Sequence, residues 1–144
     1  MTVQVQPTRD AVALNDETPK TAARAACAGG GGDYADHRLK LNYAAADAQA
    51  YARAMQKAEA RLFQSVKVVT LLDKDLTETK LGEAFTAMGA AVKSHGVFLC
   101  FLAGHGKTAE GKYYFIPQDF RFQGDDPIRI GGIDQGRWQA WRCG

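Results

Sequence analysis

Long hydrophobic runs and a surplus of one charge are both missing from this sequence of 144 residues. Its longest apolar run, Val97 to Ala103, is far shorter than the roughly 20 residues that a helix needs to cross a bilayer. The 18 lysines and arginines are nearly balanced by 16 aspartates and glutamates, so no clustered positive field is expected for phosphate backbones or anionic lipids. We therefore expect neither a membrane span nor nucleic-acid binding.

Cysteine is scarce, and the residues near Met1 lack the pattern of a secretory signal. The three cysteines, Cys27, Cys100 and Cys143, are widely spaced, and none of them forms a CxxC pair. The segment Thr2 to Lys20 is polar and contains no basic stretch followed by an apolar core. We expect a reduced, cytoplasmic protein.

Motifs for metal, serine and nucleotide chemistry are also missing. His37, His95 and His105 fall at no recognised zinc-ligand spacing, and no serine stands in a GxSxG elbow. The letters Gly106-Lys107-Thr108 close a phosphate-binding motif, but Phe101 stands where that motif requires glycine and no helix is expected to follow. We expect no metal and no cofactor.

The first 32 residues show no helical or strand periodicity over a useful length. Four consecutive glycines, residues 29–32, lose much backbone entropy on ordering and have no side chain to bury. The pattern predicts a disordered tail or linker over residues 1–32 and a folded domain over residues 33–144.

Alternating apolar patterns predict the fold of the remaining chain. Apolar residues recur every three or four positions over 42–62 and 77–94, which is typical of amphipathic helices that begin at caps such as Asn42 and Thr77. The runs 66–72 and 97–103 are nearly all apolar, as in strands of a parallel sheet covered on both faces. We predict a parallel βαβ unit in an incomplete three-layer α/β/α, Rossmann-like sandwich.

The last third of the sequence predicts smaller elements. Residues 113–116 are expected to form a short strand that ends at Pro117, and a polar, turn-rich segment follows. A helix is expected within 133–142, with Trp138 and Trp141 on one side.

His105 is the best catalytic candidate. It follows the most apolar strand, at the edge of a parallel sheet where ligands bind, and glycines flank it on both sides. Cys100 is expected to be buried midway along that strand, five positions and about 16 Å from His105 at an extended rise of about 3.3 Å per residue. We therefore expect that these two residues form no catalytic dyad.

The segments VFLCFLAGHG at 97–106 and GKYYFIPQD at 111–119 surround His105. Together they resemble the histidine half of the caspase and metacaspase-like cysteine peptidase domain. The segment from Asp33 to Ala48 resembles the first loop and helix of bacterial members. The resemblance covers residues 33–141 and implies a caspase-like α/β/α sandwich that cleaves peptide or protein substrates. It implies His105 as the catalytic histidine and the Gly106 amide as an oxyanion donor.

The chain departs from the family pattern at both ends. The family opens with an apolar strand where this chain has residues 22–32, which we expect not to serve as that strand. The family's cysteine follows the histidine by roughly 50 residues in a D-x-C-x-G-like setting, whereas only 39 residues follow His105 and Cys143 has neither that setting nor a preceding strand. We assign no nucleophile, regard Cys143 as an unlikely one, and expect the isolated chain to be inactive.

Three functions are compatible with these observations. The first is the partial, truncated domain of a caspase-like cysteine endopeptidase whose nucleophile segment is absent or supplied by another polypeptide. The second is a noncatalytic, degenerate caspase-like interaction module that self-associates through exposed sheet edges. The third is an unrelated α/β binding domain in which the Gly-His-Gly loop is accidental.

Overall fold

The computed structural model describes residues 24–62, 66–92 and 96–143. The first part of the fold has three strands and two long helices: β1 (Arg24–Gly30), α1 (Ala44–Leu62), β2 (Val66–Leu72), α2 (Glu78–Ala91) and β3 (Val97–Ala103). The second part is built from β4 (Gly106–Ala109), β5 (Lys112–Phe115), α3 (Pro127–Gly131), β6 (Ile133–Asp134) and α4 (Gln135–Cys143). Two short 3-10 turns, η1 (His37–Leu39) and η2 (Asp73–Asp75), follow β1 and β2.

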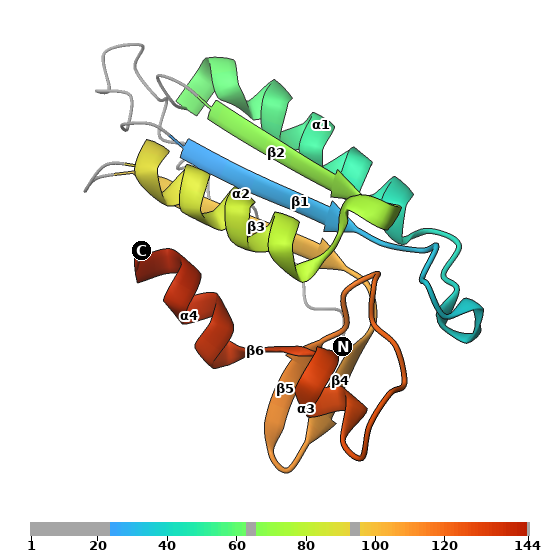
Figure 1. The fold of residues 1–144 in the computed structure, drawn as a ribbon. Coiled ribbons are helices and arrows are strands. Elements are labelled where there is room, and N and C mark those ends of the chain that lie inside the picture. The colour runs from blue at the N-terminus through green and yellow to red at the C-terminus, as the bar shows by residue number, and fades with distance from the viewer. Residues whose placement is uncertain (1–23, 63–65, 93–95, 144) are drawn as a thin grey trace, which may run out of the picture.

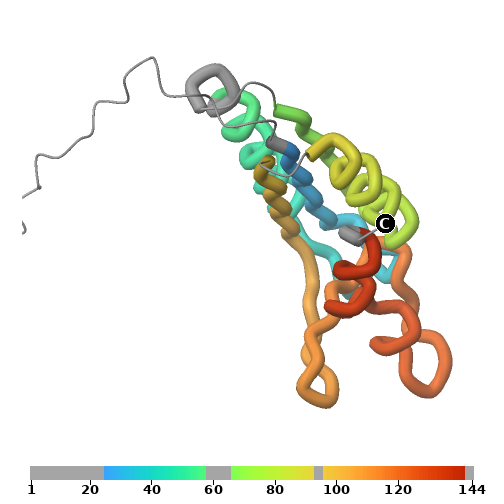
Figure 2. The backbone as a smooth tube through the Cα atoms, turned by 90° about the vertical axis from the view of Figure 1, so that its left-hand side faces the viewer, coloured from blue at the N-terminus to red at the C-terminus, as the bar shows by residue number. Residues whose placement is uncertain are grey.

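The three long strands form a parallel sheet in the order β2-β1-β3. Helices α1 and α2 cover opposite faces of this sheet, and the β4–β5 hairpin extends away from it (Figures 1 and 2). The predicted α/β fold with parallel strands and helices on both faces is therefore confirmed. Strands β2 and β3 run parallel as expected, but they pair with β1 between them and not with each other.

The central strand of the sheet lies in the segment that the sequence assigned to a tail. Residues 24–30 form β1, whose middle residues Ala25 to Ala28 are fully buried, and Gly31 and Gly32 are buried as well. The prediction of a tail or linker was therefore wrong for residues 24–32, while residues 1–23 lie outside the described residues. The error has a physical cause, because a strand made of alanine and glycine has too little apolar surface to be recognised by hydrophobicity.

Close packing on both faces explains why β1 contains only small residues between its ends. A Cβ atom on Gly30 would lie 2.1 Å from the carbonyl oxygen of Ala44 in α1, and one on Gly29 would lie 2.6 Å from a methyl group of Leu102 in β3. Ala28 packs with Ala48 and Ala52 of α1 on one face, while Ala25 and Cys27 pack on Met88 of α2 on the other. Small side chains let two helices approach the same strand.

The two long helices begin close to their expected positions. The hydroxyl of Thr77 accepts a hydrogen bond from the N–H of Lys80 over 3.3 Å, which confirms Thr77 as the cap of α2. Helix α1 begins at Ala44, so Asn42 lies outside the helix and does not cap it as expected. Within the described ranges, no helix is long and apolar enough to cross a membrane.

The second part of the chain packs beside α2. Strands β4, β5 and β6 form a small antiparallel sheet, and α4 begins directly after β6, two residues later than the sequence predicts. The rings of Trp138 and Trp141 of α4 lie tilted against that of Phe85 of α2, with ring centroids 5.2 Å and 5.9 Å from it. This aromatic cluster joins α4 to the helix layer of the parallel sheet.

Candidate functional site

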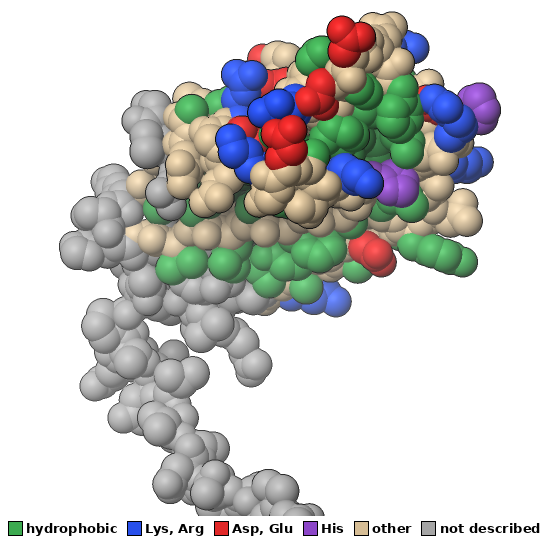
Figure 3. Space-filling model, turned by 90° about the horizontal axis from the view of Figure 1, so that it is seen from below, with side chains coloured by type: hydrophobic (Ala, Val, Ile, Leu, Met, Phe, Trp, Pro, Cys, Tyr) green, Lys and Arg blue, Asp and Glu red, His purple; other side chains and the backbone are tan. Residues whose placement is uncertain are grey.

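The carboxyl ends of the three parallel strands lie at one edge of the sheet, and the loops that leave them are neighbours there (Figure 1). Ligands bind at this edge in open parallel sheets. Strand β3 ends at Ala103, so His105 lies at this edge. Seen from below, histidine side chains lie at one end of the molecule beside lysine or arginine side chains and a hydrophobic surface (Figure 3).

Hydrogen bonds from two other loops fix the backbone of His105. Its N–H donates to the hydroxyl of Tyr34, in the loop after β1, over 2.8 Å. Its carbonyl accepts from the N–H of Ile116, after β5, over 2.9 Å. Bonds on both sides of the residue restrict the position of the Cα atom and so pre-organise the side chain, as a catalytic group requires.

The half-buried imidazole of His105 is oriented by one backbone carbonyl. Its Nε2 atom lies 2.9 Å from the oxygen of Leu39, the last residue of η1. A carbonyl can only accept, so Nε2 is the nitrogen that carries the hydrogen and Nδ1 is the acceptor in the neutral ring. The geometry therefore leaves Nδ1 as the nitrogen that can exchange a proton with another group.

Tyr34 links the loops after β1, β3 and β5. Its ring is buried and lies 5.2 Å from the imidazole of His105, centroid to centroid, and its hydroxyl donates to the carbonyl of Ile116 over 3.2 Å. Burial raises the pKa of Tyr34, so the hydroxyl keeps the proton that this bond needs. Neither Tyr34 nor Leu39 was singled out as a site residue from the sequence, because a buried hydroxyl and a backbone carbonyl leave no motif of their own.

The loop after β2 is tied to the same edge. A carboxylate oxygen of Asp73 accepts from the N–H of Gly32 over 3.0 Å and from that of Asp33 over 3.3 Å. The N–H of Gln118 donates to the carbonyl of Leu76 over 2.9 Å. The loops that follow all three parallel strands are therefore joined into one hydrogen-bonded rim.

Packing alone accounts for both glycines of the Gly-His-Gly loop. A Cβ atom on Gly104 would lie 2.8 Å from the hydroxyl oxygen of Tyr34, and one on Gly106 would lie 2.2 Å from that of Tyr113. Gly106 is exposed and is the first residue of β4. Its amide as an oxyanion donor stays a prediction.

Two of the three cysteines lie side by side in the sheet. Cys27 of β1 pairs in register with Cys100 of β3, and both lie midway along their strands. Cys27 is fully buried as a small apolar residue would be, but Cys100 is exposed, so the expectation that Cys100 is buried was wrong. The reason is its strand, because β3 lies at the margin of the sheet while α2 packs across β1 and β2.

Cys143 is the last residue of α4. This helix runs from β6 toward the opposite end of the molecule from the strand-end loops (Figure 1). The backbone thus carries Cys143 away from His105. In the part of the chain that the structure describes, no cysteine follows a strand at the rim that carries His105.

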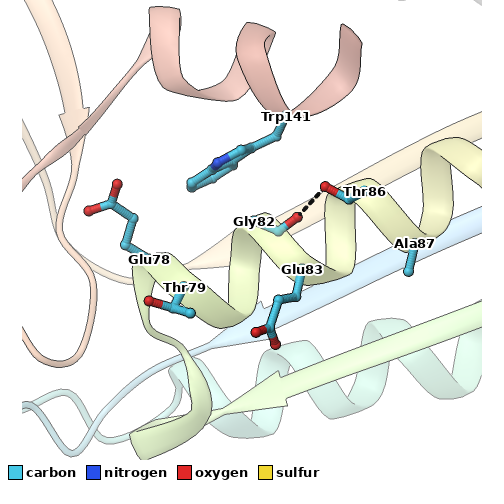
Figure 4. A pocket seen from close by; sticks show the side chains of 7 residues that line it. All are labelled: Glu78, Thr79, Gly82, Glu83, Thr86, Ala87 and Trp141. Carbon is cyan, nitrogen blue, oxygen red and sulfur yellow. Dashed lines mark hydrogen bonds between the residues drawn. The ribbon is translucent and has the colours of Figure 1, made fainter. Parts of the chain in front are cut away.

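His105 is not among the residues that line the four surface hollows described for this part of the chain. One hollow of about 580 Å³ lies between α2 and α4, where the ring of Trp141 covers Gly82 and the Thr86 hydroxyl donates to the Gly82 carbonyl over 2.9 Å (Figure 4). Glu78 at its margin binds the guanidinium of Arg137 over 2.9 Å. These contacts serve to join two helices, and they bring together no nucleophile and base.

Among residues 24–62, 66–92 and 96–143, no three histidine, cysteine, aspartate or glutamate side chains are grouped as ligands of a metal ion. His37 and His105 lie in different loops, and His95 falls outside the described residues. The side chains of the rim loops offer hydrogen-bond donors and acceptors and the imidazoles of His37 and His105. Proton transfer and hydrogen bonding are therefore the chemistry that this arrangement can perform.

Comparison with solved structures identifies proteins of similar fold. The crystal structure of protein GSU0716 from Geobacter sulfurreducens matches with a TM-score of 0.62 and 20% sequence identity, over 83% of this chain and 44% of that one. No family model and no curated protein matches this chain. The chain thus spans less than half the length of that protein, with which it shares an α/β fold.

Proposed function

We propose that this chain is the histidine-bearing part of a caspase-like cysteine endopeptidase, with His105 as the general base and acid. The observation that carries the proposal is the position of His105. It lies just after the end of the parallel strand β3, and its Nε2 atom is hydrogen-bonded to the Leu39 carbonyl. The sequence resemblance over 97–106 and 111–119 gives the reaction class. Fold and histidine geometry support it jointly.

Each feature of the histidine has a use in peptide-bond hydrolysis by a thiol. Nδ1 of His105 takes the proton of the thiol, the thiolate adds to the peptide carbonyl, and the imidazolium then gives that proton to the leaving amine. A water molecule hydrolyses the acyl-enzyme and restores the thiol. While the ring is positively charged, its Nε2–H bond to the Leu39 carbonyl becomes charge-assisted and steadies the ring.

The nucleophile comes from outside this chain in our proposal. Cys27 and Cys100 lie midway along strands, and Cys143 ends a helix that runs away from the rim. The isolated chain should therefore hydrolyse peptides no faster than buffer. A second polypeptide with an apolar strand that ends in a D-x-C-x-G segment would complete the site.

The test is reconstitution. The chain is co-expressed with a polypeptide that carries such a segment, and hydrolysis is measured on fluorogenic peptides with acidic or basic residues before the scissile bond. We expect hydrolysis that needs both chains, is lost in His105→Ala, and persists in the control His37→Ala. Hydrolysis that survives His105→Ala, or none in any combination, would refute the proposal.

A noncatalytic interaction module is the second candidate, and the sheet gives it a specific observation. In the described part of the chain, β2 and β3 are the outer strands of the parallel sheet. Such edges can pair with another strand, including that of a second copy. Stable self-association without hydrolysis in the reconstitution experiment would favour this candidate.

A further inference from the structure

The two cysteines of the sheet form a pair that the proposed peptidase chemistry does not use. Cys27 in β1 and Cys100 in β3 are register partners on neighbouring parallel strands, so their side chains point to the same face. Neighbouring strands lie about 4.8 Å apart. Disulfides form between Cα atoms about 4.4 to 6.8 Å apart, so the backbone already meets this requirement.

The two thiols differ in their exposure to solvent. Cys27 is fully buried, between Ala25 and Met88 on the α2 face of the sheet. Cys100 is exposed and can meet a dissolved reagent. The pair therefore has one thiol that encounters an oxidant and a second that only its neighbour can reach.

We propose that Cys27 and Cys100 form a reversible redox site that a small disulfide, such as glutathione disulfide, oxidises to an intramolecular disulfide. This site is independent of His105 and of the proposed peptidase function. The disulfide would covalently link β1 to β3, and the loops that follow these strands carry Tyr34 and His105.

The two steps of the reaction balance. The sulfur of Cys100 attacks one sulfur of glutathione disulfide while the Cys27 thiolate takes its proton, so a mixed disulfide forms and one glutathione thiolate leaves. Cys27 passes that proton to the released thiolate and attacks the sulfur of Cys100, which displaces the second glutathione. Two protein thiols are oxidised, one glutathione disulfide is reduced to two thiols, and the two protons pass to the released thiolates.

A hydrogen bond between the thiols supports this exchange. It lowers the pKa of Cys27 and raises the pKa of Cys100, because the Cys100 thiol stabilises a thiolate on Cys27. The thiolate of the pair therefore lies on Cys27, which can take the proton of Cys100 as the exposed sulfur attacks. The pair thus loses its first proton more readily than an isolated thiol does.

The geometry also makes the bond easy to reduce. Cβ atoms of residues side by side on parallel strands are separated by nearly the strand spacing, whereas relaxed disulfides have Cβ atoms about 3.8 Å apart. Closing that gap strains the disulfide, and strained disulfides have the more oxidising potentials of reversible sites. A mild dithiol should therefore restore both thiols.

The test uses the Cys143→Ser chain, so that only the two sheet thiols remain. After treatment with glutathione disulfide, we expect both thiols to be lost, no glutathione to be retained, and trypsin to release peptides 25–38 and 94–107 joined by a disulfide that dithiothreitol cleaves. In the additional variant Cys27→Ala, Cys100 should retain one glutathione. In Cys100→Ser, at an exposed position, Cys27 should remain a free thiol.

Three outcomes would overturn the proposal. They are glutathione retained on Cys100 while Cys27 stays reduced, a disulfide between two copies of the chain, and two thiols that stay free after treatment. Cys100→Ser keeps the test decisive if Cys27→Ala fails to fold, because a thiol at Cys27 that reacts without Cys100 would contradict the assigned order of attack.

Discussion

Strands β1 and β3 are neighbours of equal length, yet they are built in opposite ways. β1 consists mostly of alanine and glycine and is buried throughout its described side chains, whereas β3 reads VFLCFLA and is only partly buried, with Cys100 exposed. The less hydrophobic strand is thus the one at the centre. Burial here depends on what packs against the strand and not on the size of its own side chains.

The two strands also play different parts at the rim. His105 lies just after β3. The loop after β1 contains two groups that are hydrogen-bonded to it, the hydroxyl of Tyr34 and the carbonyl of Leu39. A fault in the packing of β1 should therefore disturb the histidine site as well as the core. A comparable fault in β3 should remain more local.

The largest expected effect comes from a single methyl group in β1. In Gly30→Ala, the new Cβ would lie 2.1 Å from the Ala44 carbonyl oxygen, so strand and helix must separate. We expect the free energy of unfolding to fall by about 3 kcal/mol or more, measured by urea denaturation.

The matched control is Gly89→Ala on α2, where a Cβ meets no atom within 4 Å. Alanine is a better helix former than glycine, so the free energy of unfolding of this variant should rise by about 0.5 to 1 kcal/mol. If both variants had the same stability as the parent chain, β1 would not lie against α1 as described.

A large truncation in β3 should cost less than the methyl group added to β1. The ring of Phe101 stacks on Tyr51 at 4.8 Å between centroids but is only half-buried. Replacing a fully buried phenylalanine by alanine lowers the free energy of unfolding by about 3 to 5 kcal/mol. Because Phe101 is only half-buried, we expect a decrease of about 2 kcal/mol for Phe101→Ala in the same denaturation assay. A loss larger than that of Gly30→Ala would reverse the ranking of centre and margin.

The contrast between the strands also explains how far the sequence could predict the fold. Strands β2 and β3 have continuous apolar runs, helices α1 and α2 have hydrophobic periods of three or four residues, and the structure contains all four elements. The central strand could not be found in this way, because residues 24–32 lack apolar bulk and their glycines favour a linker by backbone entropy alone. What makes them a strand is the pair of helices on either face, which a local pattern does not contain.

The candidate site was predictable to a similar degree. A histidine after an apolar strand at the carboxyl edge of a parallel sheet is visible in the sequence, and the structure places His105 there. Its supports come from positions 71 and 66 residues away, Tyr34 and Leu39, which only the folded chain brings near. The exposure of Cys100 likewise follows from the strand order and from no feature of its own segment.

The Tyr34 hydroxyl tests the link between the two loops. In Tyr34→Phe, the N–H of His105 loses its acceptor and the carbonyl of Ile116 loses a donor, while the ring stays in place. We expect the free energy of unfolding to fall by about 1.5 kcal/mol and hydrogen exchange at the His105 amide to become faster. The control Tyr43→Phe, at a side chain 74% exposed, should change neither; unchanged exchange at His105 in Tyr34→Phe would show that the two loops are independent.

The smallest effect concerns a charge in the loop after β1. The hydrogen bond from the Arg38 side chain, together with its charge and N–H, lowers the pKa of the Asp36 carboxyl from 3.8 to about 2. The same aspartate caps η1, which ends at Leu39. Because the pKa is lower in the folded chain, its contribution to stability is present above pH about 4 and is lost as the pH falls toward 2.

A carboxyl NMR titration measures this effect directly. We expect a midpoint of about 2 for Asp36, which rises in Arg38→Gln but stays below 3.8, because the N–H of residue 38 still donates to the carboxylate over 3.0 Å. The control Arg53→Gln, at an exposed position of α1, should leave the midpoint unchanged. A midpoint near 3.8 in the parent chain would mean that this ion pair does not form in solution. The carbonyl of Leu39 would then be positioned by the packing of η1 alone, and the site would depend on β1 and its neighbours without help from surface charge.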